Sequence, residues 1–134
     1  MVFIKSSEQD KEFIHECLQN YNAPFMHNYT DFSFHIEEDG KIIAGIVAAS
    51  TSDTLEIDYL YVDEAHRGKG VGSMILSEIE ARAKKAGVHQ ILLNTYSFQA
   101  PDFYRNNGYE EILEINPCFD QYSQHYFIKK LEYT

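Results

Sequence analysis

Cysteine is scarce in this sequence, with only Cys17 and Cys118 among 134 residues. Cys17 falls on the apolar side of an expected helix, and Cys118 in an expected turn after Pro117. Two separate thiols form no disulfide framework, and neither has the spacing of a metal-binding pair. The six histidines are scattered as well, so we expect no metal site and a cytoplasmic protein.

Long apolar runs are also missing. No segment approaches the ~20 apolar residues that a membrane span needs, and residues 1–6 carry neither a basic leader nor a long apolar segment. We therefore expect no secretory signal and no membrane partner. No repeat or low-complexity segment divides the chain, so its length predicts one domain over residues 1–134.

Basic charge is in short supply, because 11 Lys and Arg face 21 Asp and Glu, for a net charge of −10. This balance argues against a nucleic-acid partner, since a phosphate backbone needs a basic face. Acidic residues crowd the segments before residue 65, whereas several basic residues lie after it. The acidic side is either a solvated surface or a region that attracts a cationic ligand, and charge alone leaves both open.

The chain has seven glycines, and three of them stand at alternate positions within residues 68–72. The surrounding residues 60–74 predict the end of a strand, a glycine-rich loop and the start of an amphipathic helix. The first turn of a helix leaves its N–H groups without internal partners and adds partial positive charge. With Arg67 and Lys69 beside it, the loop is typical of a site for a phosphate-like anion.

Periodicity predicts the other elements. Residues 2–5 are a candidate strand, and apolar positions at helical spacing predict an amphipathic helix over about residues 7–21, started by a capping arrangement. The segment through Thr30 is expected as a loop or a second short helix. Alternation then predicts a strand from Asp31, a two-residue turn at Asp39-Gly40 and a three-strand antiparallel meander.

Later segments complete an α+β fold. Residues 41–50 are expected to form a central strand covered on both faces, and a strand, helix, strand unit after the meander is expected to be right-handed and locally parallel. The remaining expected elements are strand 55–62, a helix from Val71 ended by Gly87, strand 88–95, a short helix 101–107, and a closing hairpin of 109–115 and 124–131 around Asn116-Pro117. The predicted architecture is a mixed, mostly antiparallel sheet of six to seven strands flanked by about four helices.

Two known phosphate-binding patterns do not fit the glycine loop. In a P-loop, Ser or Thr would follow Lys69, but Gly70 stands there, and Ser73 departs from the dinucleotide fingerprint. The loop does match Arg-x-x-Gly-x-Gly at residues 67–72. It follows a strand that ends in Leu60-Tyr61-Val62.

A second motif lies downstream, where residues 100–109 have the form Ala-x-x-aromatic-Tyr-x-x-x-Gly-aromatic. With the glycine loop, this order of motifs resembles the GNAT superfamily of N-acetyltransferases over most of the chain from Asp31 onward. The resemblance implies a GNAT-like acyltransferase fold and acetyl-CoA as the donor. It places the pyrophosphate on Arg67, Gly68, Lys69, Gly70, Val71, Gly72 and Ser73, and the pantetheine arm along Leu60, Tyr61 and Val62.

The resemblance also suggests catalytic roles. Tyr104 matches a family tyrosine near the CoA sulfur that can act as a general acid toward the departing thiolate; otherwise it fills the core. Glu56 matches a catalytic glutamate of some members, and Asp58 shares its strand face, although both could simply face solvent. Arg105 either meets a nucleotide phosphate or solvates its helix.

One departure concerns Ser97, where many relatives have Asn, so the contacts of that Asn are in doubt. We expect His66 to be an exposed loop residue rather than a catalyst.

The acceptor is less defined. In the family, specificity usually comes from the N-terminal helix region and nearby loops, which here hold aromatic residues suited to a small cationic amine such as an amino acid, a polyamine or an amine-bearing antibiotic. These residues are Tyr21, Phe25, His27, Tyr29, Tyr96 and Phe98. The alternatives are a peptide or protein N-acetyltransferase and a CoA-binding module without turnover. A homodimer is possible, as is common among small relatives.

Overall fold

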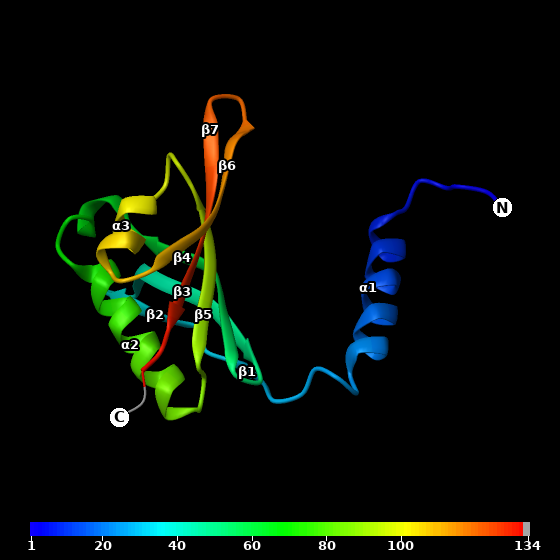
Figure 1. Cartoon of the computed structure of the whole chain (residues 1–134), viewed down its shortest axis with the longest axis horizontal. Helices are drawn as coiled ribbons and strands as arrows, with labels where there is room; N and C mark the ends of the chain where they lie inside the picture. Colours follow the sequence, from blue (N-terminus) through cyan, green and yellow to red (C-terminus); the bar gives the residue numbers. More distant parts are fainter. Residues whose placement is uncertain (133–134) are drawn as a thin grey trace.

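The computed structural model describes residues 1–132 as one sheet with helices on one side and an N-terminal helix that stands apart from it (Figure 1). The helices are α1 (Glu8–Asn22), the short 3-10 helix η1 (Glu64–His66), α2 (Val71–Lys85) and α3 (Pro101–Asn106). The strands are β1 (Tyr29–Asp31), β2 (Phe34–Glu38), β3 (Lys41–Thr51), β4 (Thr54–Val62), β5 (Gln90–Tyr96), β6 (Glu110–Phe119) and β7 (Tyr122–Lys130).

The sheet has seven strands in the order β1-β3-β4-β5-β7-β6, and β2 also pairs with β3. Only β4 and β5 are parallel; the other pairs are antiparallel. This confirms the expected mixed, mostly antiparallel sheet. The part of the chain that the structure describes has three α-helices rather than about four, because the segment before Thr30 contributes strand β1 instead of a second helix.

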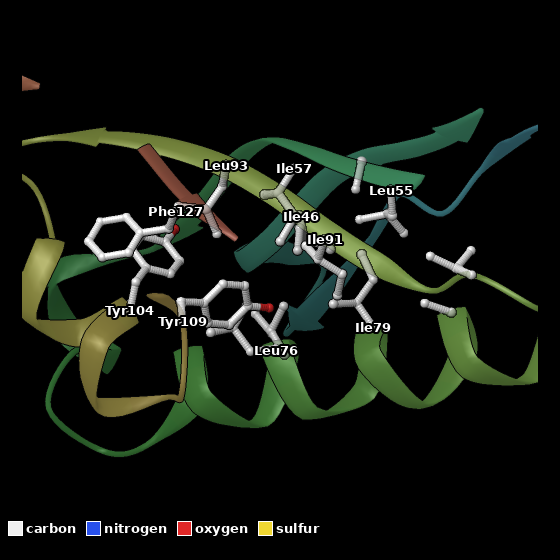
Figure 2. Packing of buried hydrophobic residues seen from close by; sticks show 14 of the residues in the cluster. Ile46, Leu55, Ile57, Leu76, Ile79, Ile91, Leu93, Tyr104, Tyr109 and Phe127 are labelled. Carbon is white, nitrogen blue, oxygen red and sulfur yellow. The ribbon is translucent and has the colours of Figure 1, made fainter. Parts of the chain in front are cut away.

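The core lies between the sheet and α2 (Figure 2). The helix buries residues three and four positions apart, which places them on one side. They face alternate residues of β4 and β5, together with Phe127 of β7, which is fully buried. The buried helix residues are Ile75, Leu76, Ile79 and Ala83, and their main strand partners are Leu55, Ile57, Ile91 and Leu93.

The opposite face of the sheet carries no helix of the same chain (Figure 1). Val47 of β3 is 46% exposed, and Tyr59 and Tyr61 of β4 are 71% and 55% exposed. The expectation that residues 41–50 are covered on both faces is therefore wrong for this chain. The strand is central in the sheet, but only one of its faces is packed.

Helix α1 begins as predicted. The Ser7 side chain accepts a hydrogen bond from the Asp10 amide, and the Asp10 carboxylate accepts one from the Ser7 amide, which forms a capping box. The helix nevertheless buries none of its residues. Residues 2–5 form no strand, because no other strand of the chain lies beside them.

The closing hairpin turns later than predicted. Strand β6 runs through Asn116-Pro117, and the turn falls at Asp120-Gln121. Cys118 therefore lies in a strand rather than in a turn. The register of β6 shifts between Ile115 and Phe119, and β6 is an edge strand, so a proline without an N–H is tolerated there.

We expect Ile79→Ala to lower the free energy of unfolding by about 2–5 kcal/mol, because it opens a cavity in the packed core. Met74→Ala is the matched control, since Met74 lies on the same helix but is 64% exposed, and its effect should stay within about 0.5 kcal/mol. Urea unfolding of both variants measures the difference. Equal losses would contradict this placement of the core.

Candidate active site

The site begins where two neighbouring strands separate. Strands β4 and β5 pair only from Thr54 to Glu56, opposite residues 90–92. Beyond that point β4 continues beside β3, while β5 continues beside β7. The register of β4 on β3 also shifts so that Asp58 is an extra residue, a bulge that bends the strand. The second half of β4 thereby lies free of β5.

A cleft of about 360 Å³ lies between this free half of β4, the loop before α2, and α3. Its lining is mostly apolar. The lining residues are Leu60, Val62, His66, Arg67, Gly68, Gly70, Val71, Gly72, Ser73, Ala100, Phe103 and Tyr104.

The glycines of the loop have two separate reasons to be glycine. Gly68 and Gly70 have φ values of 74° and 81°, which disfavour residues with side chains. Nothing lies within 4 Å of the position that a Cβ would take at either residue, so the backbone there faces open space. At Gly72 a Cβ would come within 3.0 Å of Cζ of Phe103, so this glycine allows α3 to pack against α2.

Gly70 is also the N-cap of α2 and offers no side-chain cap. The first N–H groups of the helix consequently have no partner in the helix or at the cap, and they sit at the positive end of its dipole. These amides fit an anionic group such as a diphosphate. The anion site expected from the glycine spacing stays a prediction, for which this helix start offers the donors.

Arg67 braces the loop against the strand. Its Nε donates a hydrogen bond to the carbonyl oxygen of Val62 at 2.8 Å, and its guanidinium lies 5.8 Å from the ring centre of Tyr61. The arginine also lines the cleft, whereas Lys69 and Tyr61 do not appear among the described residues that line it. Tyr61 instead points to the uncovered face of the sheet, where it is 55% exposed.

His66 is held in place rather than free in solvent, contrary to expectation. Its Nδ1 lies 2.5 Å from Asp63 Oδ1, and its Nε2 lies 2.6 Å from Glu38 Oε2. The pKa of His66 is raised above its ordinary 6.5, mainly by the hydrogen bond to Asp63, against an opposing effect of desolvation and with a smaller addition from Glu38. This bridge ties the loop to β2.

Tyr104 lines the cleft from α3. It is 7% exposed, and its ring packs near those of Phe103, Tyr109 and Phe127, with centroids 5.1, 5.8 and 6.0 Å away (Figure 2). No hydrogen-bond partner of its hydroxyl is found within residues 1–132. Burial raises the pKa of Tyr104 to about 12, so the phenol stays protonated at neutral pH and can donate a proton.

Arg105 points away from the cleft and belongs to a polar network. Its guanidinium pairs with Asp102 at 2.6 Å and with Glu111 at 2.8 Å. Desolvation would raise the pKa of Glu111, but hydrogen bonds from buried His125 and from Arg105 outweigh it and lower that pKa. His125 Nε2 in turn lies 2.8 Å from the Ser123 hydroxyl. The network ties α3, which carries Tyr104, to the β6–β7 hairpin.

Glu56 and Asp58 lie on a different surface from Tyr104. Glu56 stands opposite Ala49 of β3, and both acids line a depression of about 240 Å³ with Tyr29 and neighbouring residues of β3 and β4. Of the residues singled out from the sequence, the cleft therefore brings together Leu60, Val62, Arg67, Gly68, Gly70, Val71, Gly72, Ser73 and Tyr104. It does not bring in Tyr61, Lys69, Arg105, Glu56 or Asp58.

The aromatic residues expected around an acceptor do not gather in one place. Tyr96 and Phe98 stack at 5.5 Å between ring centres and form a cluster with Phe119 and Tyr122 near the β6–β7 turn. Tyr21 belongs to the last turn of α1 and Phe25 to the turn that follows it, and α1 stands away from the sheet (Figure 1).

Ser97 serves a structural purpose at the end of β5. Its Oγ accepts a hydrogen bond from the Ser123 amide at 3.0 Å, and its own amide donates to the Ser123 carbonyl at 2.8 Å. It thereby joins β5 to β7. Ser97 is not among the residues that line the cleft.

Three lining residues were not predicted as such: His66, Ala100 and Phe103. The Asp63-x-x-His66 spacing could have indicated the bridge at His66, since it matches one turn of a 3-10 helix. Ala100 and Phe103 belong to the second motif, but only the position of α3 shows that they face the cleft.

Two features are absent from residues 1–132. No helix there is long and apolar enough to cross a membrane. No group of three or more His, Cys, Asp or Glu side chains in the same range could hold a metal ion.

The chain is similar to known acetyltransferases. The acetyltransferase (GNAT) domain matches residues 30–111. Blasticidin-S acetyltransferase from Streptomyces morookaense is 34% identical over 95 residues, covering 70% of each protein. The crystal structure of an acetyltransferase from Bacillus cereus is 34% identical and covers 98% of both chains with a TM-score of 0.85.

A more distant structure, aminoglycoside 6'-N-acetyltransferase complexed with coenzyme A, shares the fold at 13% identity, with a TM-score of 0.67 and coverage of 100% of this chain and 99% of that one. On the family match and the identity to the Streptomyces protein, this chain belongs to the GNAT acetyltransferase family. The relatives named above are all acetyltransferases.

The bridge at His66 generates a prediction about pH. Because the folded-state pKa is raised, His66 contributes stability that is fully present below its ordinary pKa of 6.5 and is lost as the pH rises through the folded value. The difference in Tm between wild type and His66→Gln should therefore shrink from pH 5.5 to 8.5. Glu38→Gln removes one carboxylate and should weaken that pH dependence. A difference that grows with pH would contradict the bridge.

Proposed function

We propose that this protein is an acetyl-CoA-dependent N-acetyltransferase that moves an acetyl group directly to a primary amine, with a small molecule as the acceptor. The observation that carries this proposal is the continuity of one cleft. Its lining brings together the start of α2 with its unpartnered amides, the apolar side chains of Leu60 and Val62, and the hydroxyl-bearing ring of Tyr104.

The donor fits this cleft by its chemistry. Its diphosphate carries the negative charge that the amides around Gly70 and the Arg67 guanidinium favour. Its pantetheine arm is extended and largely apolar, which suits a wall built from Leu60, Val62 and Phe103. The CoA complex of the related aminoglycoside enzyme is consistent with this use of the fold.

We infer a direct transfer. The amine nitrogen attacks the thioester carbon, so a C–N bond forms and the C–S bond breaks. The amine gives up its proton to a base, and the departing sulfur takes a proton from the Tyr104 hydroxyl. A backbone amide of the Leu60-Tyr61-Val62 segment polarises the thioester oxygen.

The base is the less defined partner. Glu56 is the first candidate, because its side chain lies on the strand that leads into the cleft, close to where β4 leaves β5. Since Glu56 lines a different depression from Tyr104, a water molecule between the carboxylate and the amine fits the geometry better than direct contact. Asp58 is the second candidate.

For the acceptor, an amine-bearing antibiotic or similar small cation has the most support. The acidic residues Glu56 and Asp58 lie beside exposed Tyr29 and Tyr59, and the relative from Streptomyces morookaense is named for blasticidin-S. A peptide or protein amine is the alternative within the class. Outside it, a module that binds CoA without turnover would keep the loop but release no thiol.

Release of free thiol from acetyl-CoA over a panel of amino acids, polyamines, aminated antibiotics and peptides tests these possibilities. We expect release with a small amine, and mass spectrometry of the product identifies it. Release with peptides alone would move the assignment to a peptide acetyltransferase. Binding of CoA with no release for any amine would overturn the proposal in favour of the module.

Loss of the general acid should appear in turnover. We expect Tyr104→Phe to lower kcat by about 10²–10⁴-fold, with little change in the KM for acetyl-CoA. Tyr109→Phe is the matched control, because Tyr109 is equally buried but bonds Glu80 outside the cleft at 3.0 Å. Equal kcat in the two variants would remove Tyr104 from the mechanism.

Binding of the diphosphate should depend on Gly70. We expect Gly70→Glu to weaken CoA affinity more than tenfold, or about 1.4 kcal/mol, because it puts a carboxylate in front of the amides. Gly87→Glu is the control: Gly87 also has positive φ and open space, but follows the other end of α2. Calorimetric titration that finds both affinities unchanged would contradict the assigned loop.

A further inference from the structure

Helix α1 packs against no other element within residues 1–132. It is 15 residues long and buries none of them. A helix of this length is marginal in water without tertiary contacts. One side of it is nonetheless apolar, with neighbours three and four positions apart. That side consists of Phe13, Ile14, Cys17, Leu18 and Tyr21, all of them exposed.

The sheet has an apolar face that is not covered by a helix within residues 1–132. Its face opposite α2 exposes a groove of about 350 Å³ that is mostly apolar. Val47 and Tyr59 stand opposite each other in the β3–β4 register and are 46% and 71% exposed. The groove residues are Ser33, Phe34, His35, Ile42, Gly45, Ile46, Val47, Tyr59 and Tyr61.

We propose that the protein is a homodimer in which each chain lays its α1 on the uncovered sheet face of the other. One chain then presents both halves of the contact, an apolar helix and an apolar sheet face. In two such chains related by a twofold axis, both helices and both sheet faces are covered at once. A different protein would cover either the helix or the sheet face and leave the other exposed.

The connection after α1 directs the helix away from its own sheet. The carbonyl of Asn22 accepts hydrogen bonds from the amides of Phe25 and Met26, each at 2.9 Å. The rings of Tyr21 and Phe25 lie 6.3 Å apart across this turn. This turn ends α1, and residues 26–28 then lead to β1, so that α1 stands away from the sheet (Figure 1).

The same arm is part of a solved structure. Residues 1–28 are about a fifth of the chain. If they lay in a different place in the second structure, the TM-score of the superposition could not exceed about 0.8, because only the remaining 106 of 134 residues would superpose. The Bacillus cereus acetyltransferase reaches 0.85 over 98% of both chains. The outward arm is thus shared with that protein.

The area is sufficient for a stable dimer. Four large apolar side chains of α1 are exposed: Phe13, Ile14, Leu18 and Tyr21. If each loses on the order of 100 Å² on docking, two helices remove roughly 800 Å², and the sheet faces beneath them lose a similar area. The sum of roughly 1,600 Å² is the size of a standard specific interface.

Docking also affects the proposed acceptor side. Glu56 and Tyr59 share the uncovered face, since their partners Ala49 and Val47 are two residues apart on β3. The partner's helix would then wall the space beside Glu56, so that each acceptor site is built from two chains. This consequence rests on the proposed function; the dimer itself does not.

Sedimentation equilibrium of the full chain tests the dimer without reference to activity. We expect about 31 kDa, twice the 15.5 kDa of one chain. Leu18→Asp should shift the mass to 15.5 kDa, and Val47→Asp, on the other side of the contact, should do the same. Gln19→Asp is the control on the polar side of α1 and should stay dimeric. A monomeric wild type, or a dimeric Leu18→Asp, would overturn the proposal.

Cross-linking distinguishes exchange from folding back. In a Cys118→Ser, Val47→Cys chain, a bismaleimide should join Cys17 of one chain to position 47 of the other and give a covalent dimer. Cys118→Ser alone is the control and should give none. A link within one chain, identified by the mass of the joined peptides, would show that α1 returns to its own sheet and would overturn the proposal. So would the absence of any link to position 47.

Discussion

The separation of β4 from β5 is the constraint on which the rest of the molecule depends. Three residues of parallel pairing hold the two strands together, and beyond them each strand follows a different neighbour. The free half of β4 forms one wall of the cleft, and the loop that leaves it enters α2 through Gly70. A longer parallel ladder would pair the backbone of Leu60 and Val62 with β5 and leave the cleft without that wall.

Where local chemistry decides the structure, the sequence predicted it well. The alternating glycines placed the loop because positive φ and unshielded amides depend on those residues alone, and Asp39-Gly40 marked its turn for the same reason. The turn predicted at Asn116-Pro117 was wrong. A proline can also lie within a strand at the edge of a sheet, and the local sequence does not show that β6 is an edge strand. The ion pair between Arg105 and Glu111 could not be predicted from the sequence either, because the two side chains meet only when β6 packs beside α3.

The two faces of the sheet explain why the apolar pattern of β3 was misleading. Ala44 and Ile46 are buried against the helices, whereas Val47 on the other side is exposed in the single chain. Hydropathy shows that a strand is apolar but not whether anything in the chain covers each of its faces. The same ambiguity applies to α1, whose amphipathic pattern and capping box correctly predicted a helix but not that the helix buries none of its residues.

The most direct test of the anion site is an amide NMR titration of the protein with CoA and, separately, with pantetheine, which lacks the diphosphate. We expect CoA to shift the amide signals of Gly70, Gly72 and Ser73 more than any others, and pantetheine to leave these three signals in place while shifting those near Tyr104. Shifts by CoA that bypass these three amides would contradict the proposed anion site.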